Sequence, residues 1–391
     1  MLRARADWAY NREMPTADTD CSFLLELTST PTAAGHEGRV IAKVERWLGD
    51  RPHLAVERDE AGNLVLSAKS EPAGDPVYIT AHLDHPGFVV DRVEGRTVHL
   101  WFRGGVRDPF FPGTAIRIHI DDTSIGATIV DAGKADPDRP VTATLDESAD
   151  ASLVRGGEIA TWALPEPELD GDLVRTNACD DLATVCAALE AFDELTRPGT
   201  PEPAHPVRLL FTLAEEIGFI GAIAACKLGT MPEGSRIVAL ENSRSYPHDS
   251  PIGAGPILRV GDRMSTFTPA LTGALAKVAQ GIVKEDESFK WQRKLMPGGA
   301  CEATAYCAYG YAATCVCLPL GNYHNMANLL ESEQEPDRAA ELASIEREYI
   351  SLSDYRMLVR WLVAIGRSPL EAPYARAKME ELYEKRKDVL A

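Results

Sequence analysis

The segment 207-VRLLFTLAEEIGFIGAIAA-225 opens with an apolar run that is typical of a buried strand and then places Glu215 beside Glu216. Two adjacent carboxylates at the end of a buried strand repel each other unless a cation or a reaction makes use of them. The residues that follow have the pattern of a helix, so strand and helix alternate within this one stretch. The segment therefore predicts an α/β fold with a chemical site at the end of a strand.

The same alternation extends over most of the chain. Further buried-strand patterns lie at 63-NLVLSA-68, 76-PVYITAHL-83, 236-RIVALE-241 and 314-TCVCLPL-320, and helical patterns lie between them. The run at 76–83 is almost wholly apolar, which is typical of a central strand. The alternation predicts an α/β fold in the form of a three-layer sandwich with a mostly parallel central sheet.

The composition changes after Val90. Residues 94 to about 165 contain short β-rich runs separated by Gly, Asp and Pro, without helical periodicity of useful length. This pattern predicts an inserted β-rich domain at 94–165. The main domain is then divided into a first part at 1–93 and a second part at 166–391.

Charge and composition exclude some classes of partner. The chain of 391 residues carries a formal net charge of −19, which argues against nucleic acid or an anionic membrane as a partner. No apolar run reaches the about 18 residues of a membrane-spanning helix, and residues 1–20 lack the apolar stretch of a signal peptide. The 8 cysteines are scattered without a CxxC pair and are expected to be reduced. We therefore expect a cytoplasmic protein.

Metal-capable side chains also follow other predicted strands. His82 ends the apolar run at 76–83, and Asp84 lies two residues further on the same face of an extended chain. Asp84 can therefore orient the ring of His82 or lie beside a bound ion. A hydrogen-bonded histidine at a strand end, without any metal, explains His82 equally well when it is considered alone.

The remaining candidates each have an ordinary structural explanation. Asp180 and Asp181 precede a helical pattern, where one aspartate is explained by helix capping and two are explained less well. Glu241 follows a buried strand, and His324 follows another strand and a glycine-containing loop. Together these residues place imidazoles and carboxylates at the carboxyl ends of strands, where open α/β sheets have their sites. This mixture suits zinc, cobalt or manganese better than calcium.

The motifs AHLDHPGF, NACDDLA, TLAEEIGFIGA, VALEN and LPLGNYHN, in this order, resemble the di-metal tetrahedral (TET-type) glutamyl aminopeptidases, a family in the clan of co-catalytic zinc exopeptidases. The resemblance runs from about Leu24 to about His324 and includes FRGG at 102–105 and IGAGPILRVGD at 252–262. It implies an α/β sandwich that carries an inserted small β-barrel (PDZ-like) domain. In the family this domain serves oligomerisation and substrate access.

The resemblance also implies a site with two divalent metal ions, zinc first and cobalt or manganese as alternatives. The implied metal ligands are His82, Asp180, Glu216, Glu241 and His324. Asp180 would bridge the two ions, while His82 and Glu241 complete one set of ligands and Glu216 and His324 complete the other.

Two further residues have implied catalytic roles. Glu215 would stay unligated as the general base, and Asp84 would orient His82. Adjacent glutamates suit this division, because one carboxylate can point at an ion and the other at the attacking water. Asp181 would follow Asp180 across a cis peptide bond.

The implied activity is that of a metal-dependent exopeptidase that removes N-terminal residues from short peptides. A carboxypeptidase or an N-acyl amino acid deacylase of the same clan is the alternative, and a catalytically inactive metal-binding assembly subunit is a third reading. We expect a homo-oligomer between a dimer and a dodecamer, which binds peptides and neither nucleic acid nor membrane.

The sequence departs from the family at positions that bear on substrate preference. The family usually has Asp where this chain has Glu241, and Asp-Glu-Ile-Gly where this chain has residues 84–87, Asp-His-Pro-Gly. Its Gly-Thr-Asp stretch is replaced at 299–302, and its Arg-Tyr before the last histidine is replaced at 321–323. The implied metal ligands survive these changes.

Overall fold

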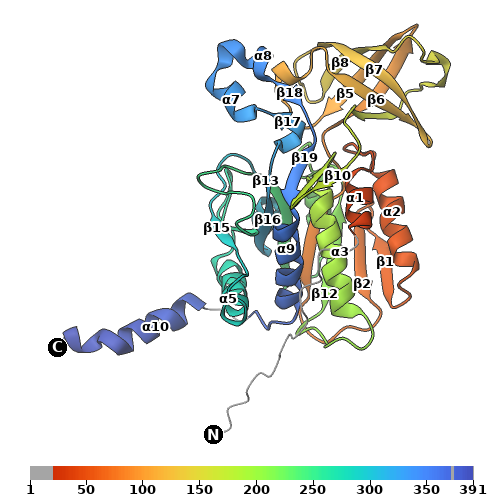
Figure 1. Ribbon diagram of the computed structural model, residues 1–391. Helices are drawn as coiled ribbons and strands as arrows, with labels where there is room; N and C mark the ends of the chain where they lie inside the picture. Colours follow the sequence, from red (N-terminus) through yellow and green to blue (C-terminus); the bar gives the residue numbers. More distant parts are fainter. Residues whose placement is uncertain (1–20, 371–373, 391) are drawn as a thin grey trace.

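The computed structural model in Figure 1 describes residues 21–370 and 374–390; the segment 1–20, where no signal peptide is expected, lies outside the described residues. The main domain is built on an eight-stranded sheet. In spatial order its strands are β1 (Leu54–Arg58), β2 (Leu64–Ala68), β12 (Val207–Thr212), β3 (Val77–His82), β13 (Arg236–Arg244), β16 (Ala312–Leu320), β14 (Ile257–Arg259) and β15 (Gln292–Lys294).

The central strands β12, β3, β13 and β16 are parallel to one another, as the sequence predicts. Every residue of β3 is buried, which explains its almost unbroken apolar sequence. Thr212, the last residue of β12, pairs with His82, the last residue of β3. The carboxyl ends of these strands therefore meet at one edge of the sheet, and the metal-capable residues gather there.

Helices cover both faces of the sheet, so the predicted three-layer sandwich is confirmed. One face packs against α1 (Ser22–Thr28), α2 (Gly38–Gly49), α3 (Leu182–Thr196), α5 (Pro269–Glu285) and α9 (Leu352–Gly366), and the other packs against α4 (Ile220–Leu228) and α6 (Glu302–Ala308). Alternation along the strands supplies both cores. Ile79 and Val316 pack on the first face, whereas Tyr78 and Cys315 pack on the second.

The second domain is a closed antiparallel barrel that lies above the carboxyl edge of the sheet in Figure 1. In order around the barrel its strands are β4 (Gly87–Glu94), β5 (Thr97–Arg103), β8 (Arg139–Leu145), β7 (Thr123–Ala132), β6 (Ala115–Ile120) and β9 (Ile159–Trp162). Aromatic rings fill it: the Phe88 ring centroid lies 4.8 Å from that of Phe102 and 4.8 Å from that of Trp162.

The barrel contains β4, which begins at Gly87, before residue 94, where the sequence predicts the start of the inserted domain. The first half of β4 is buried like a strand of the main sheet. It therefore continues the apolar pattern of β3, and the composition changes only where β4 emerges at the surface.

Smaller elements connect the two domains. They are the sheet of β10 (Glu168–Asp170), β11 (Leu173–Thr176) and β19 (Glu348–Ser351), the ladder of β17 (Met326–Ala327) and β18 (Ser344–Ile345), and the helices α7 (Leu329–Gln334) and α8 (Ala339–Leu342). The C-terminal helix α10 (Tyr374–Arg386) projects away from the body in Figure 1, and its side chains from Arg376 onward are exposed. Within the described residues no helix has both the length and the apolar character that crossing a membrane requires.

The start of α4 packs so closely that a glycine is required there. Gly221 N donates to Leu213 O at 2.8 Å, and a Cβ at position 221 would lie 2.4 Å from that oxygen and 2.5 Å from Leu213 N. By contrast, a Cβ on Gly281 in α5 meets nothing within 4 Å. The two glycines therefore offer a matched test of the packing below the Glu215–Glu216 turn.

We predict that Gly221→Ala lowers the free energy of unfolding by about 1–3 kcal/mol, because the backbone of Leu213 must move. Gly281→Ala is expected to raise it by up to about 1 kcal/mol, since alanine is the better helix former. Urea denaturation followed by circular dichroism measures both. Equal stability of the two variants would contradict the packing described for α4.

Candidate metal centre

The carboxyl edge of the sheet brings all of the sequence-predicted site residues into one cluster. His82 ends β3, Glu215 and Glu216 follow β12, and Glu241 lies in β13. The other contributors come from loops: Asp180 precedes α3, and His324 lies in a short 3₁₀ turn after β16. The peptide bond between Asp180 and Asp181 is cis, as the resemblance implies.

Asp180 lies between the two histidines. Its Oδ1 is 3.4 Å from His82 Nε2, and its Oδ2 is 3.6 Å from His324 Nε2. Each oxygen of one carboxylate thus faces a different imidazole. This is the arrangement that a carboxylate shared between two cations requires.

The glutamates complete the cluster. Glu216 Oε1 lies 3.3 Å from His324 Nε2, and Glu215 Oε2 lies 3.9 Å from His82 Nε2. Ligand atoms of His82, Asp180 and Glu216 lie within 4.8 Å of one another, and so do those of His82, Glu215 and Glu241. These two geometric groups do not match the ligand sets that the resemblance implies. The division of ligands between two ions, and Glu215 as a non-ligand, therefore remain predictions.

Several polar atoms that face this space are buried without a hydrogen-bond partner among the described residues. They are His82 Nε2, Asp180 Oδ1, Glu216 Oε1 and Glu241 Oε2. Buried polar atoms are rarely left unpaired, because each costs about 1–3 kcal/mol. Nitrogen and oxygen donors that converge in this way fit divalent zinc, cobalt or manganese.

The electrostatics of the cluster also call for a cation. Burial, together with Glu216, raises the pKa of Glu215 well above its usual value, and burial together with Asp180 does the same to the pKa of Glu241. Burial alone would lower the pKa of His82, but the negative charge of Glu215 and Asp180 outweighs it and raises that pKa well above the usual value. Divalent ions would relieve this excess of buried negative charge.

The pKa of Asp180 is lowered, whereas those of Glu215 and Glu241 are raised. Burial by itself would raise the pKa of Asp180, but contacts with His324 and His82 outweigh burial and hold it below the usual value. Asp180 therefore stays ionised more readily than Glu215 and Glu241, which suits a residue shared between two ions.

Asp84 has a wider positional role than the sequence predicts. Its main-chain oxygen lies 3.1 Å from His82 Nδ1, which orients the ring. In addition, its carboxylate accepts hydrogen bonds from Glu215 N at 2.9 Å and Glu216 N at 3.0 Å. One fully buried aspartate thus holds both the histidine and the turn that carries the paired glutamates.

Two residues that were not identified as site residues from the sequence hold the backbone of Asp180 and His324 by hydrogen bonds. Glu348 in β19 accepts from Asp180 N at 3.1 Å and from His324 N at 2.8 Å. His85 Nδ1 donates to Asp180 O at 2.6 Å. Nothing in the local sequence marks Glu348, because its partners are backbone amides brought close only by the fold. His85 could have been found, because it lies next to Asp84 at a position where the chain departs from the family motif.

The barrel also contacts the cluster. His324 Nδ1 donates to Gly105 O at 2.9 Å, in the loop that follows β5. The ring of Tyr323 stacks on that of His324, with centroids 3.7 Å apart. The orientation of His324 therefore depends on both domains.

Comparison with protein-family models gives a match to the M42 glutamyl aminopeptidase model over residues 62–334. A search of curated protein sequences gives no significant match.

Solved structures share the whole architecture. The Pyrococcus horikoshii TET1 peptidase, described as assembling into a tetrahedron or a large octahedral shell, aligns with a TM-score of 0.69 at 20% identity, over 88% of this chain and 98% of that one. Aminopeptidase APDkam598 from the archaeon Desulfurococcus kamchatkensis gives 0.70 at 20% identity, over 88% and 93%. A TET aminopeptidase from a marine sediment archaeon of the Thaumarchaeota gives 0.71 at 18% identity, over 88% and 96%. At these identities the likeness shows a common fold.

We predict that Asp84→Asn lowers the free energy of unfolding by about 1–3 kcal/mol, because an amide NH₂ would face a buried backbone N–H. Asp150→Asn is the matched control, since Asp150 also accepts from a backbone amide, Ser152 N at 3.0 Å, but is exposed. Its loss is expected to stay below about 1 kcal/mol. Urea denaturation in the presence of a chelator separates this effect from metal binding. A loss no larger than that of the control would show that Asp84 does not hold the turn.

Proposed function

The chain belongs to the M42 glutamyl aminopeptidase family, and we propose that it is a metal-dependent exopeptidase that removes N-terminal residues from short peptides. The observation that carries this proposal is the carboxylate of Asp180 between two imidazoles, with the paired glutamates beside it. A purely structural metal site has no use for a second glutamate next to a ligand.

We assign the ligands of two divalent ions as follows. Asp180 is shared, His82 and Glu241 belong to one ion, and Glu216 and His324 belong to the other. The support for this division is that each oxygen of Asp180 faces a different histidine, while Glu216 contacts His324. When bound, such ions polarise the scissile carbonyl and lower the pKa of an attacking water.

Glu215 is assigned as the general base. It is buried, and its backbone N–H is fixed by Asp84, so its carboxylate is held near the ligands of one ion. A carboxylate whose pKa is raised by burial accepts a proton from water more readily than an exposed one. In the same position it can return that proton to the amine that leaves.

The free amine of the peptide is expected to lie near Glu241. Burial, with the negative charges of Asp180 and Glu215, raises the pKa of Glu241 well above its usual value, and a positively charged ammonium group nearby would offset that repulsion. The family usually has aspartate at this position, and the longer glutamate can change which substrates fit. Carboxypeptidase and deacylase activity are therefore tested as alternatives.

The proposal also covers the oligomeric state and the cellular compartment of the protein. The TET1 peptidase is described as assembling into a tetrahedron or a large octahedral shell, and we propose a homo-oligomer for this chain as well. Seven cysteines form no disulfide, which fits a reducing compartment such as the cytoplasm: Cys179, Cys186, Cys226, Cys301, Cys307, Cys315 and Cys317.

Two variants separate the proposed roles of the adjacent glutamates. Glu215→Gln is expected to keep both metals and to lose about 100-fold or more in kcat, because only proton transfer is removed. Glu216→Gln is expected to lower the metal content at one site. Metal content by mass spectrometry and turnover of aminoacyl amides are the two measurements.

The exposed Glu287→Gln, which removes the same charge elsewhere, is the control and should change neither quantity. If Glu215→Gln and Glu216→Gln lose metal to the same extent, Glu215 is a ligand and not the base.

Peptides with one blocked end test the direction of cleavage. An aminopeptidase requires a free N-terminus, so N-acetylation of a tripeptide should abolish hydrolysis while C-terminal amidation is tolerated. A chelator should abolish hydrolysis of the unblocked and the amidated peptide, and zinc, cobalt or manganese should restore it. Cleavage of the acetylated peptide at its C-terminus, or release of acetate, would favour the carboxypeptidase or the deacylase instead. Full activity in the chelator would exclude the metal mechanism.

A further inference from the structure

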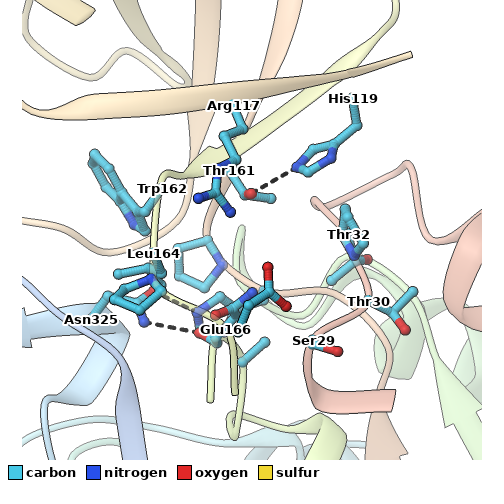
Figure 2. A pocket seen from close by; sticks show the side chains of 16 residues that line it. Ser29, Thr30, Thr32, Arg117, His119, Thr161, Trp162, Leu164, Glu166 and Asn325 are labelled. Atoms are coloured by element: carbon cyan, nitrogen blue, oxygen red, sulfur yellow. Dashed lines mark hydrogen bonds between the residues drawn. The ribbon is translucent and has the colours of Figure 1, made fainter. Parts of the chain in front are cut away.

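A cavity lies between the barrel and the main domain, and His85 is among the residues that line it. It has a volume of about 160 Å³, and strands β6 and β9 of the barrel form one wall. The loop that follows α1 and the segment 164–166 form the opposite side, as Figure 2 shows. None of the proposed metal ligands lines it.

Arg117 of β6 contributes an unbalanced positive charge to this cavity. Its side chain is half-buried, and its guanidinium makes no hydrogen bond or ion pair with any of the described residues. The neighbouring His119 adds no charge, because burial, with Arg39 and Arg117, lowers its pKa to about 4. A guanidinium with its donors free in a semi-enclosed space is a site for a carboxylate.

Three hydroxyl groups on the opposite side of the cavity can act as acceptors. The hydroxyls of Ser29, Thr30 and Thr32 donate their hydrogens to the carbonyls of Leu25 at 2.7 Å, Glu26 at 2.8 Å and Leu83 at 3.0 Å, respectively. Their oxygen lone pairs therefore remain open to a donor.

Glu166 adds a negative charge on that side. Its side chain is exposed, and its carboxylate points into the cavity in Figure 2 and forms no ion pair with the described residues. The nearby Arg347 donates to the main-chain oxygen of Glu166 and is paired with the carboxylate of Glu168. A cation at one side and a carboxylate with hydroxyl oxygens at the other form a complementary pair of charges that the protein itself does not join.

We propose that this cavity binds a single free α-amino acid. Its α-carboxylate lies against Arg117, and its α-ammonium group lies against Glu166 and the hydroxyl oxygens. The apolar surfaces of Pro86 and Leu164 in the wall accommodate a small side chain. A volume of about 160 Å³ admits one small amino acid and excludes a longer peptide.

His85 connects this cavity to the metal centre. It lines the cavity, donates to Asp180 O at 2.6 Å, and places Nε2 3.0 Å from Asn325 Oδ1, where Asn325 directly follows His324. An occupant that shifts His85 therefore acts on the backbone of Asp180 and on the loop of His324. Binding in the cavity and binding of metal are expected to influence each other reciprocally. Free amino acids are products of the proposed reaction, but their binding here does not require that activity.

Isothermal titration calorimetry of the metal-loaded full-length protein tests the site with three probes: alanine, N-acetylalanine and alaninamide. Alanine is expected to bind, and each blocked derivative is expected to bind about tenfold more weakly or worse, because each loses one charged contact. Arg117→Gln and Glu166→Gln should each weaken alanine binding by about tenfold. Arg155→Gln removes the same charge as Arg117→Gln from an exposed position on the barrel and should leave binding unchanged.

Binding of alanine at the metal centre alone would be insensitive to Arg117→Gln, and that result overturns the proposal. It is also overturned if alanine does not bind, or if alaninamide or N-acetylalanine binds as tightly as alanine. Arg117→Lys keeps the charge and should retain most of the affinity, which guards against a folding defect in the glutamine variant. Thermal melts of all variants accompany the titrations.

Discussion

The carboxylate of Asp180, shared between His82 and His324, is the interaction on which the rest of the site depends. His82 comes from the end of β3 and His324 from a 3₁₀ turn after β16, so their positions depend both on the sheet and on the loop that follows it. The protein then fixes the backbone around Asp180 with charged or polar side chains, Glu348 on its amide and His85 on its carbonyl. Buried negative charge held in one place this firmly is stable only when cations accompany it.

The barrel also helps to fix the positions of the residues in the cluster. Gly105 O accepts from His324, so a proposed metal ligand of the main domain is oriented by the barrel. Nearby, Arg107 of the barrel loop contacts Glu333 of α7 at 2.6 Å, and Glu333 also receives two hydrogen bonds of 3.0 Å from Arg244 of β13. Strand, helix and barrel loop are thereby joined through one carboxylate.

Much of this could be predicted from the sequence, for a simple reason. Parallel strands end at a common edge, so residues that follow apolar runs, such as His82 and Glu241, converge whatever the loops do. Residues whose partners are backbone atoms of distant segments could not be found in this way, and Glu348 is the clearest case. A role for Arg117 could not be predicted either, because a single arginine in an alternating strand does not indicate a binding site unless the residues that face it across the cavity are known. The barrel begins at Gly87, earlier than the change in composition indicates, because β4 begins as a buried strand like β3.

The connection between β3 and β4 has a mechanical consequence. Only residues 83–86 separate the end of β3, where His82 lies, from the first strand of the barrel. This connection has little room to bend, since a Cβ on Gly104 would lie 2.6 Å from Pro86 Cβ, and one on Gly87 would lie 2.9 Å from Ala33 Cβ. A rotation of the barrel relative to the sheet would therefore act on His82 almost as a rigid lever. If a neighbouring subunit bound to the barrel and rotated it, the position of His82 at the end of β3 would change directly.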